Sequence, residues 1–174
     1  MMETVMIIAL TLVLAIAIWT DLRSGLLPNR LTFSAMGLAL LAHGWMSGFQ
    51  GMIFSLAGLG TGFGIFLLLY LWGGMGAGDV KLMAAVGSIV GAYGALVSGI
   101  LAILVGGIYA LGAMSYQWGF VEMCRRLSRA TYGAILTGGK GWSRDLQLPF
   151  RLRYGLAIAA GTLLFCVGFN PFGG

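Results

Sequence analysis

Six apolar stretches make up most of this chain, and they constrain its fold more than any other feature. Of its 174 residues 59% are apolar and only 9% are charged. A soluble domain carries roughly a quarter charged residues, so this chain could not cover a globule with a water-compatible surface. In hydrocarbon, long uninterrupted apolar runs indicate helices. The sequence therefore predicts an all-α, polytopic membrane bundle of about six transmembrane helices in a single domain over residues 1–174. The stretches are 4–20, 31–49, 51–72, 80–93, 95–117 and 154–170.

Two of these stretches need comment. The fourth is short, and its boundary with the fifth falls in the glycine-containing segment 91–94. The first could be mistaken for a signal peptide, but Glu3 is the only charge before it and no small-residue cleavage site ends it. It is therefore expected to be retained as a membrane span.

The basic residues all fall on one side of the predicted topology. By the positive-inside rule these connections are cytoplasmic, which places both termini outside. The net charge of +5 follows from this arrangement. It requires no nucleic acid partner, and contact with anionic membrane lipid is a by-product. The ten residues are Arg23, Arg30, Lys81, Arg125, Arg126, Arg129, Lys140, Arg144, Arg151 and Arg153.

The longest predicted cytoplasmic connection is the loop 119–153. Its first half mixes basic and apolar residues and is expected to form an amphipathic helix in the membrane interface. Its centre, "TGGKG", is expected to be a turn.

The sequence gives no pattern for a metal site or cofactor. Cys124 and Cys166 are far apart and no C-x-x-C occurs, so neither zinc nor a disulfide framework is predicted. The single histidine, His43, lies within the second apolar stretch and is expected to form a hydrogen bond between helices. Glycines spaced four apart, such as Gly58 and Gly62, are expected to let helix backbones pack closely within the bundle, or in a dimer interface.

Two acidic residues stand directly against apolar stretches. Asp21 ends the first stretch and Asp79, in "GMGAGDVKL", precedes the fourth, so both lie at the predicted cytoplasmic side. Taken singly, Asp21 could pair with Arg23 at the interface, and Asp79 could complement a helix dipole. Two acids at the same membrane depth are costly, however, and such residues usually have a function. Glycines before Asp79 would leave the backbone open to a close approach.

A pair of facing carboxylates supplies a specific chemistry. At close range they cannot both ionise, so the pair shares a proton. The ionised member can accept a proton from water while the protonated member donates to a peptide carbonyl or leaving amine. This is aspartyl protease chemistry, and the sequence does not assign the base because a coupled pair titrates as a unit. Lys81 could orient a carboxylate, bind substrate or anchor the chain at the interface.

Three segments resemble the type IV prepilin peptidases, a family of intramembrane aspartyl proteases. Residues 76–79 are a G-x-G-D motif, and their continuation "VKL" is similar to that family in particular. The segment "DLRSGLLPNRLT" resembles its first catalytic segment, and "LPFRLRYGLAIAAGTLL" resembles its last, in which a proline and an aromatic-glycine pair enter the final span.

The resemblance implies an aspartic endopeptidase whose catalytic pair is Asp21 and Asp79. It also implies that five other residues shape the site or bind substrate: Gly76, Gly78, Lys81, Pro28 and Asn29. The implied substrates are prepilins or pseudopilins, cut after the glycine that ends their basic leader, at the cytoplasmic face of the inner membrane. Because the paired C-x-x-C motifs of longer members are missing, no methyltransferase activity is expected. The compact form is similar to peptidases of tight-adherence (Flp) pilus systems.

Two alternatives remain open at the level of sequence. An archaeal-type preflagellin peptidase would use the same chemistry. A non-catalytic membrane scaffold or small transporter would use the two acids for assembly or ion binding instead.

Overall fold

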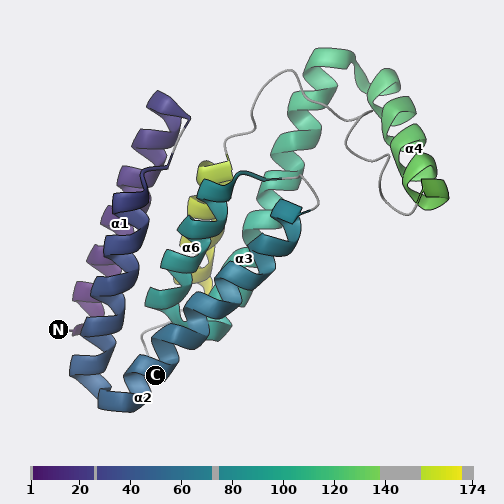
Figure 1. The fold of residues 1–174 in the computed structure, drawn as a ribbon. Coiled ribbons are helices and arrows are strands. Elements are labelled where there is room, and N and C mark those ends of the chain that lie inside the picture. Colours follow the sequence, from purple (N-terminus) through teal and green to yellow (C-terminus); the bar gives the residue numbers. More distant parts are fainter. Residues whose placement is uncertain (1, 26, 72–74, 138–153, 170–174) are drawn as a thin grey trace. The chain divides into compact units, whose positions relative to one another are not determined.

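In the computed structural model, which describes residues 2–25, 27–71, 75–137 and 154–169, every regular element is an α-helix (Figure 1). The predicted all-α class is therefore confirmed over these residues. The helices are α1 (Met2–Ser24), α2 (Asn29–Leu71), α3 (Ala77–Trp118), α4 (Phe120–Thr137) and α6 (Tyr154–Phe169).

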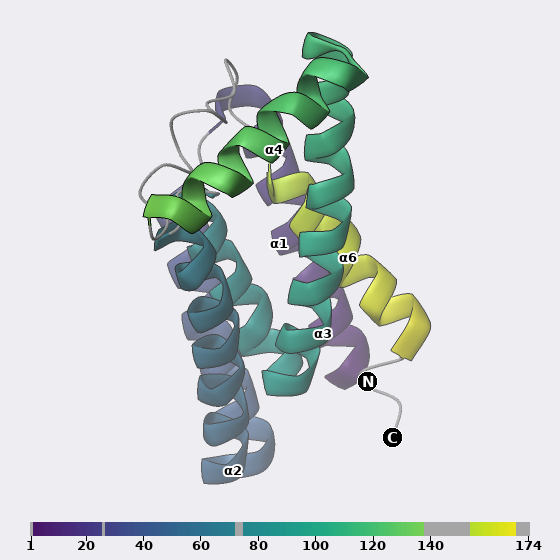
Figure 2. The same ribbon diagram turned by 90° about the vertical axis from the view of Figure 1, so that its right-hand side faces the viewer.

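Helix α2 consists of two arms that meet at Gly48, where the backbone leaves helical geometry (φ 59°, ψ −138°). A Cβ atom built on Gly51 would collide with the backbone carbonyl of His43. In a straight helix these residues would be about 12 Å apart, so the chain reverses at Gly48. The positive φ favours glycine there. The connection predicted between the second and third stretches is thus confirmed, and the reversal can be followed in Figures 1 and 2.

Helix α3 is interrupted in the same way at Gly91 (φ 77°). A Cβ atom built on Gly87 would lie 3.1 Å from the side chain of Ala95, which again shows two helical arms folded against each other. The ring of Phe54 fills the space beside Gly91, so a side chain there would be excluded on steric as well as conformational grounds. The predicted boundary at 91–94 is confirmed, at its first residue.

Among the residues that the structure describes, three helices are long and apolar enough to cross a membrane, at Val5–Ser24, Asn29–Leu71 and Ala77–Gln117, and α6 is a shorter apolar helix. The chain is accordingly described as a membrane protein. Its six crossings and the outside position of both termini stay predictions.

The arms of α2 and α3 pack with their backbones in direct contact. A Cβ atom on Gly58 would collide with the carbonyl of Gly87, and one on Gly62 would collide with the carbonyl of Met83. Close packing within the bundle, predicted for these spacings, is confirmed for Gly58 and Gly62. Gly60 faces open space and takes no part in this contact.

Two buried hydrogen bonds also join α2 to the first arm of α3, one from each arm of α2. The Nε2 atom of His43 lies 3.0 Å from the carbonyl oxygen of Ile89, and the hydroxyl of Ser55 donates to the carbonyl of Ser88 over 2.9 Å. The role predicted for His43 is confirmed. These bonds satisfy polar side chains inside an apolar bundle and fix how the arms meet.

The chain divides into a larger unit, Met1–Gly106 with Arg153–Gly174, and a smaller one, Gly107–Leu152. The core of the larger unit is apolar. Within it α1 contacts both α6 and α2. The largest fully buried side chains of this core include Phe66, Phe165, Leu82, Met83 and Ile158.

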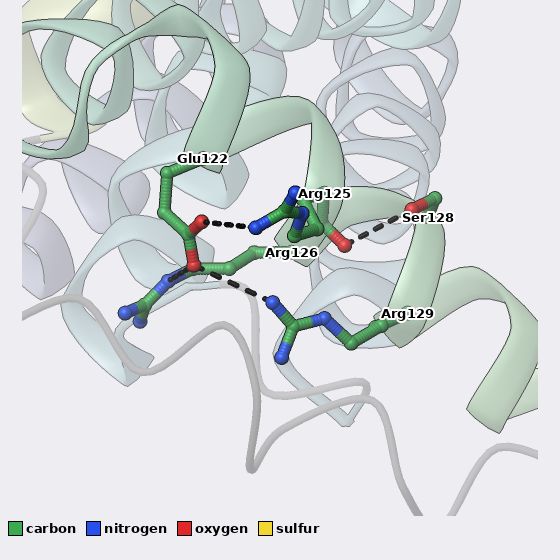
Figure 3. A network of polar contacts seen from close by, with 5 residues as sticks. All are labelled: Glu122, Arg125, Arg126, Ser128 and Arg129. Carbon is green, nitrogen blue, oxygen red and sulfur yellow. Dashed lines mark hydrogen bonds and ion pairs between the residues drawn. The ribbon is translucent and has the colours of Figure 1, made fainter.

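The smaller unit contains α4, which confirms the helix predicted in the first half of 119–153. Glu122 in its first turn forms ion pairs with three arginines that lie one and two turns further along. The distances from its carboxylate oxygens to the guanidinium nitrogens are 3.4–3.8 Å (Figure 3). An acid that precedes its basic partners complements the helix dipole. The location of α4 in the membrane interface stays a prediction, and the expected "TGGKG" turn lies outside the described residues.

Candidate active site

Asp21 lies in the last turn of α1. The helix ends because Gly25 adopts a left-handed conformation (φ 62°) and donates its N–H to the Asp21 carbonyl over 3.0 Å. This is a common way to terminate a helix at glycine. The Asp21 side chain does not turn out to solvent at the helix end, since only 6% of the residue is exposed.

Asp79 lies in the first turn of α3, and the spacing of the G-x-G-D motif explains its position. The Asp79 N–H donates to the carbonyl of Gly76 over 3.1 Å, and the Gly76 N–H donates to Oδ2 of Asp79 over 3.1 Å. The second bond is one half of a capping box, with Gly76 as the N-cap and Asp79 as the third helical residue, while the first is a backbone turn bond because glycine has no side chain. Asp79 is 8% exposed, and one of its oxygens is fixed by the backbone.

The start of α6 brings a third segment to Asp21 and to α3. The bare Cα of Gly155 packs on the Asp21 carboxyl group, so that an added Cβ would be 2.7 Å from Oδ2. The neighbouring Tyr154 sits against Gly106 of α3, where an added Cβ would be 2.9 Å from its ring. Two adjacent residues of α6 therefore pack on the Asp21 carboxyl group and on α3.

These contacts gather four helix ends at one place in the larger unit. They are the C-terminal end of α1 and the N-terminal ends of α2, α3 and α6, which Figures 1 and 2 show toward one end of that unit. The expectation that Asp21 and Asp79 come to the same side of the bundle agrees with this arrangement.

The start of α2 packs on the start of α3. Leu27 lies on the bare Cα of Gly78, at 3.2 Å from an added Cβ. The ammonium group of Lys81 donates a 2.8 Å hydrogen bond to Oδ1 of Asn29 and lies 5.6 Å from the ring centroid of Phe33. Pro28 precedes α2 as its N-cap, and its carbonyl accepts the N–H groups of residues 31 and 32 over 3.1 and 3.4 Å.

Every residue singled out from the sequence thus has a place in one cluster. Gly76 and Asp79 form the cap, Gly78 receives Leu27, and Lys81 is bonded to the residue after Pro28. Sequence reasoning did not assign site roles to Tyr154, Gly155, Leu27 or Phe33. Tyr154 and Gly155 could have been found from the sequence, because they are the aromatic-glycine pair of the segment "LPFRLRYGLAIAAGTLL".

Two buried carboxylates in an apolar bundle are the least expected feature of this cluster. Burial of an acid in a membrane segment is costly, and such acids mark functional sites. Over the described ranges, no group of three or more histidine, cysteine, aspartate or glutamate side chains could hold a metal ion. The two buried carboxyl groups offer the cluster a general acid and a general base.

Comparison with protein-family models gives a match to the type IV leader peptidase family over residues 8–111. The chain belongs to this family. Comparison with curated proteins and with solved structures gives no match. The family match confirms the resemblance found in the sequence.

Membership of the type IV leader peptidases makes the chain a membrane protease of the kind that acts on prepilin leader peptides. The matched range contains both aspartates and the whole α1–α2 connection. It ends before α6, so the contacts of Tyr154 and Gly155 are information from the structure and not from the family match.

Proposed function

We propose that this leader peptidase is an aspartic endopeptidase with Asp21 and Asp79 as its catalytic pair. The observation that carries the proposal is the burial of both carboxyl groups, at 6% and 8% exposure, at the C-terminal end of α1 and the N-terminal end of α3. The substrates are type IV prepilins of the Flp-like class, and the scissile bond follows the glycine at the end of the leader.

The reaction uses the pair as general base and general acid. The ionised carboxylate accepts a proton from a water molecule as that water attacks the peptide carbonyl carbon. The protonated carboxyl group donates to the carbonyl oxygen as it becomes tetrahedral. When the C–N bond then breaks, the carboxyl group that took the proton from water gives it to the leaving amine, and the other carboxylate takes a hydroxyl proton from the intermediate, which restores the starting pair. The Gly76 N–H bond to Asp79 holds that side chain in one orientation, so that less of the alignment has to be achieved on substrate binding.

The site is expected to face the cytoplasm of the inner membrane. Arg23 and Arg30 flank the α1–α2 connection and Lys81 follows Asp79, and basic residues mark cytoplasmic connections. A substrate whose basic leader stays in the cytoplasm would reach the helix ends there, while its apolar segment remains in the bilayer. No C-x-x-C pair occurs in the 174 residues, so the proposal covers peptide hydrolysis and no methyl transfer.

The test compares three proteins in liposomes with an Flp-like prepilin: wild type, Asp21→Asn and Asp79→Asn. Leader loss is followed by gel shift, and the new N-terminus is identified by mass spectrometry. We expect cleavage after the glycine by wild type and none by either variant, because asparagine retains the size of aspartate but cannot exchange a proton. Glu122→Gln is the matched control, since it neutralises an acid in α4.

Cleavage by either aspartate variant would refute the assignment of the pair. Failure of the wild type with several prepilins, alongside intact folding, would favour the scaffold or transporter interpretation.

A further inference from the structure

Lys81 is held by two side chains of one helical turn. Its Nζ atom donates to Oδ1 of Asn29 over 2.8 Å and lies 5.6 Å from the ring of Phe33. Asn29 and Phe33 are four residues apart and so lie on the same face of α2. An ammonium group has three donors and is attracted to an aromatic face, so both partners suit its chemistry.

Lys81 and Asp79 lie on different faces of α3. Residues two apart in a helix do not face each other, and Asp79 precedes Lys81 by two in α3. The lysine is therefore directed to α2 while the aspartate is directed to its cap and to the site. The two charged residues of the "GDVK" segment thus have different partners, the start of α3 for Asp79 and the start of α2 for Lys81.

The bond joins the two segments that carry the aspartates. Asn29 is the first residue of α2, eight residues after Asp21, and Lys81 is one helical turn into α3. A second contact lies beside it, because Leu27 packs on the bare Cα of Gly78. The short α1–α2 connection is thus fixed to α3 at two adjacent points.

We propose that Lys81 and Asn29 are positioning residues, whose hydrogen bond latches the connection after Asp21 to the first turn of α3 and so sets the placement of the two aspartates. The proposal rests on the proposed function of that pair. It gives Lys81 a role inside the protein, in place of a role in binding the leader or in anchoring to lipid.

The expected effect is on turnover. Loss of a hydrogen bond from a charged donor, together with slight misplacement of a reacting group, corresponds to a fall of about tenfold to a hundredfold in kcat. KM should stay within about twofold of wild type, because the latch contacts no substrate. Loss of a substrate contact would instead raise KM.

A double-mutant cycle tests the latch directly, with Lys81→Met, Asn29→Leu and the double variant assayed on a prepilin in liposomes. We expect each single variant to lose turnover and the double variant to lose no more than the worse single, because both remove the same bond. Lys81→Arg should restore most of the activity, since a guanidinium group can donate to Asn29 and stack on Phe33. Arg30→Met, which removes an exposed cation beside Asn29, is the control and should remain within about twofold of wild type.

A second measurement does not depend on catalysis. Hydrogen exchange of the amides of Leu31 and Thr32, which are bonded to the Pro28 carbonyl, should speed up in Lys81→Met and in Asn29→Leu but not in Arg30→Met. Faster exchange with retained thermal unfolding would support the latch even if the aspartate variants refuted the proposed function. Additive losses in the cycle, a raised KM in Lys81→Met, or unchanged exchange would each overturn it.

Discussion

Replacement of Gly155 by alanine is the sharpest perturbation that the site offers, because it adds one carbon atom beside Asp21. That carbon would lie 2.7 Å from Oδ2, 3.2 Å from Cγ and 3.3 Å from Cβ of Asp21. Ordinary contact begins at 3.4 Å, so the carboxyl oxygen and the helix must separate by about 0.7 Å. Either the side chain of Asp21 rotates or α6 moves outward.

The expected result follows from the size of that displacement. A misplacement of about 1 Å can lower turnover by about a hundredfold, and the displacement here is somewhat smaller. We therefore expect kcat for prepilin cleavage to fall by roughly 10- to 100-fold in Gly155→Ala, with KM little changed. Overpacking should also cost about 1–3 kcal/mol in the free energy of unfolding. Both are measurable, by leader cleavage in liposomes and by thermal unfolding in detergent.

Gly168→Ala provides the matched control in the same helix, because an added Cβ there meets nothing within 4 Å. Alanine is favoured over glycine in a helix by up to about 1 kcal/mol, so this variant should be as active as wild type and no less stable. Wild-type turnover in Gly155→Ala would refute the reasoning, since it would mean that the Asp21 carboxyl group is not held by α6 in the working enzyme.

Two further predictions concern packing and surface charge away from the aspartates. Gly58→Ala should lower the unfolding temperature sharply, because the new Cβ meets the backbone carbonyl of Gly87. Gly60→Ala is the control and should not lower it, because its new Cβ meets open space. Equal unfolding temperatures for the two variants would contradict the assigned helix contact. Glu122→Gln should destabilise α4 by less than about 1 kcal/mol, because its three arginine partners are solvent-exposed, and hydrogen exchange in α4 should lose its difference from wild type in 1 M salt.

The helices and their reversals could be predicted from the sequence, because they depend on local features: the length of each apolar run and the glycines that interrupt it. The reversals at Gly48 and Gly91 fall where the apolar runs are interrupted, and a positive φ at a glycine needs no distant partner. The acids could also be found, because a carboxylate beside an apolar run is rare enough to be noticed.

The partners of the site residues could not be predicted, for two physical reasons. Gly155 matters because it has no side chain, which leaves room for the carboxyl group of Asp21. The two residues are far apart in the sequence, so no local pattern links them. Lys81 has its nearest acid two residues away, which a helix directs to a different face, and its true partner Asn29 is 52 residues distant. A sequence pattern indicates which residues share a face of one helix. It does not indicate which faces of different helices meet, because that depends on how the bundle packs.

The contact between Gly155 and Asp21 also has a consequence in time. The chain is made from its N-terminus at roughly 5–20 residues per second, so Gly155 follows Asp21 by roughly 7–27 s. During this interval α1 with Asp21 has been synthesised, but Gly155 of α6, which packs on the Asp21 carboxyl group, has not. The proposed aspartate pair is therefore expected to become complete only when α6 joins the bundle.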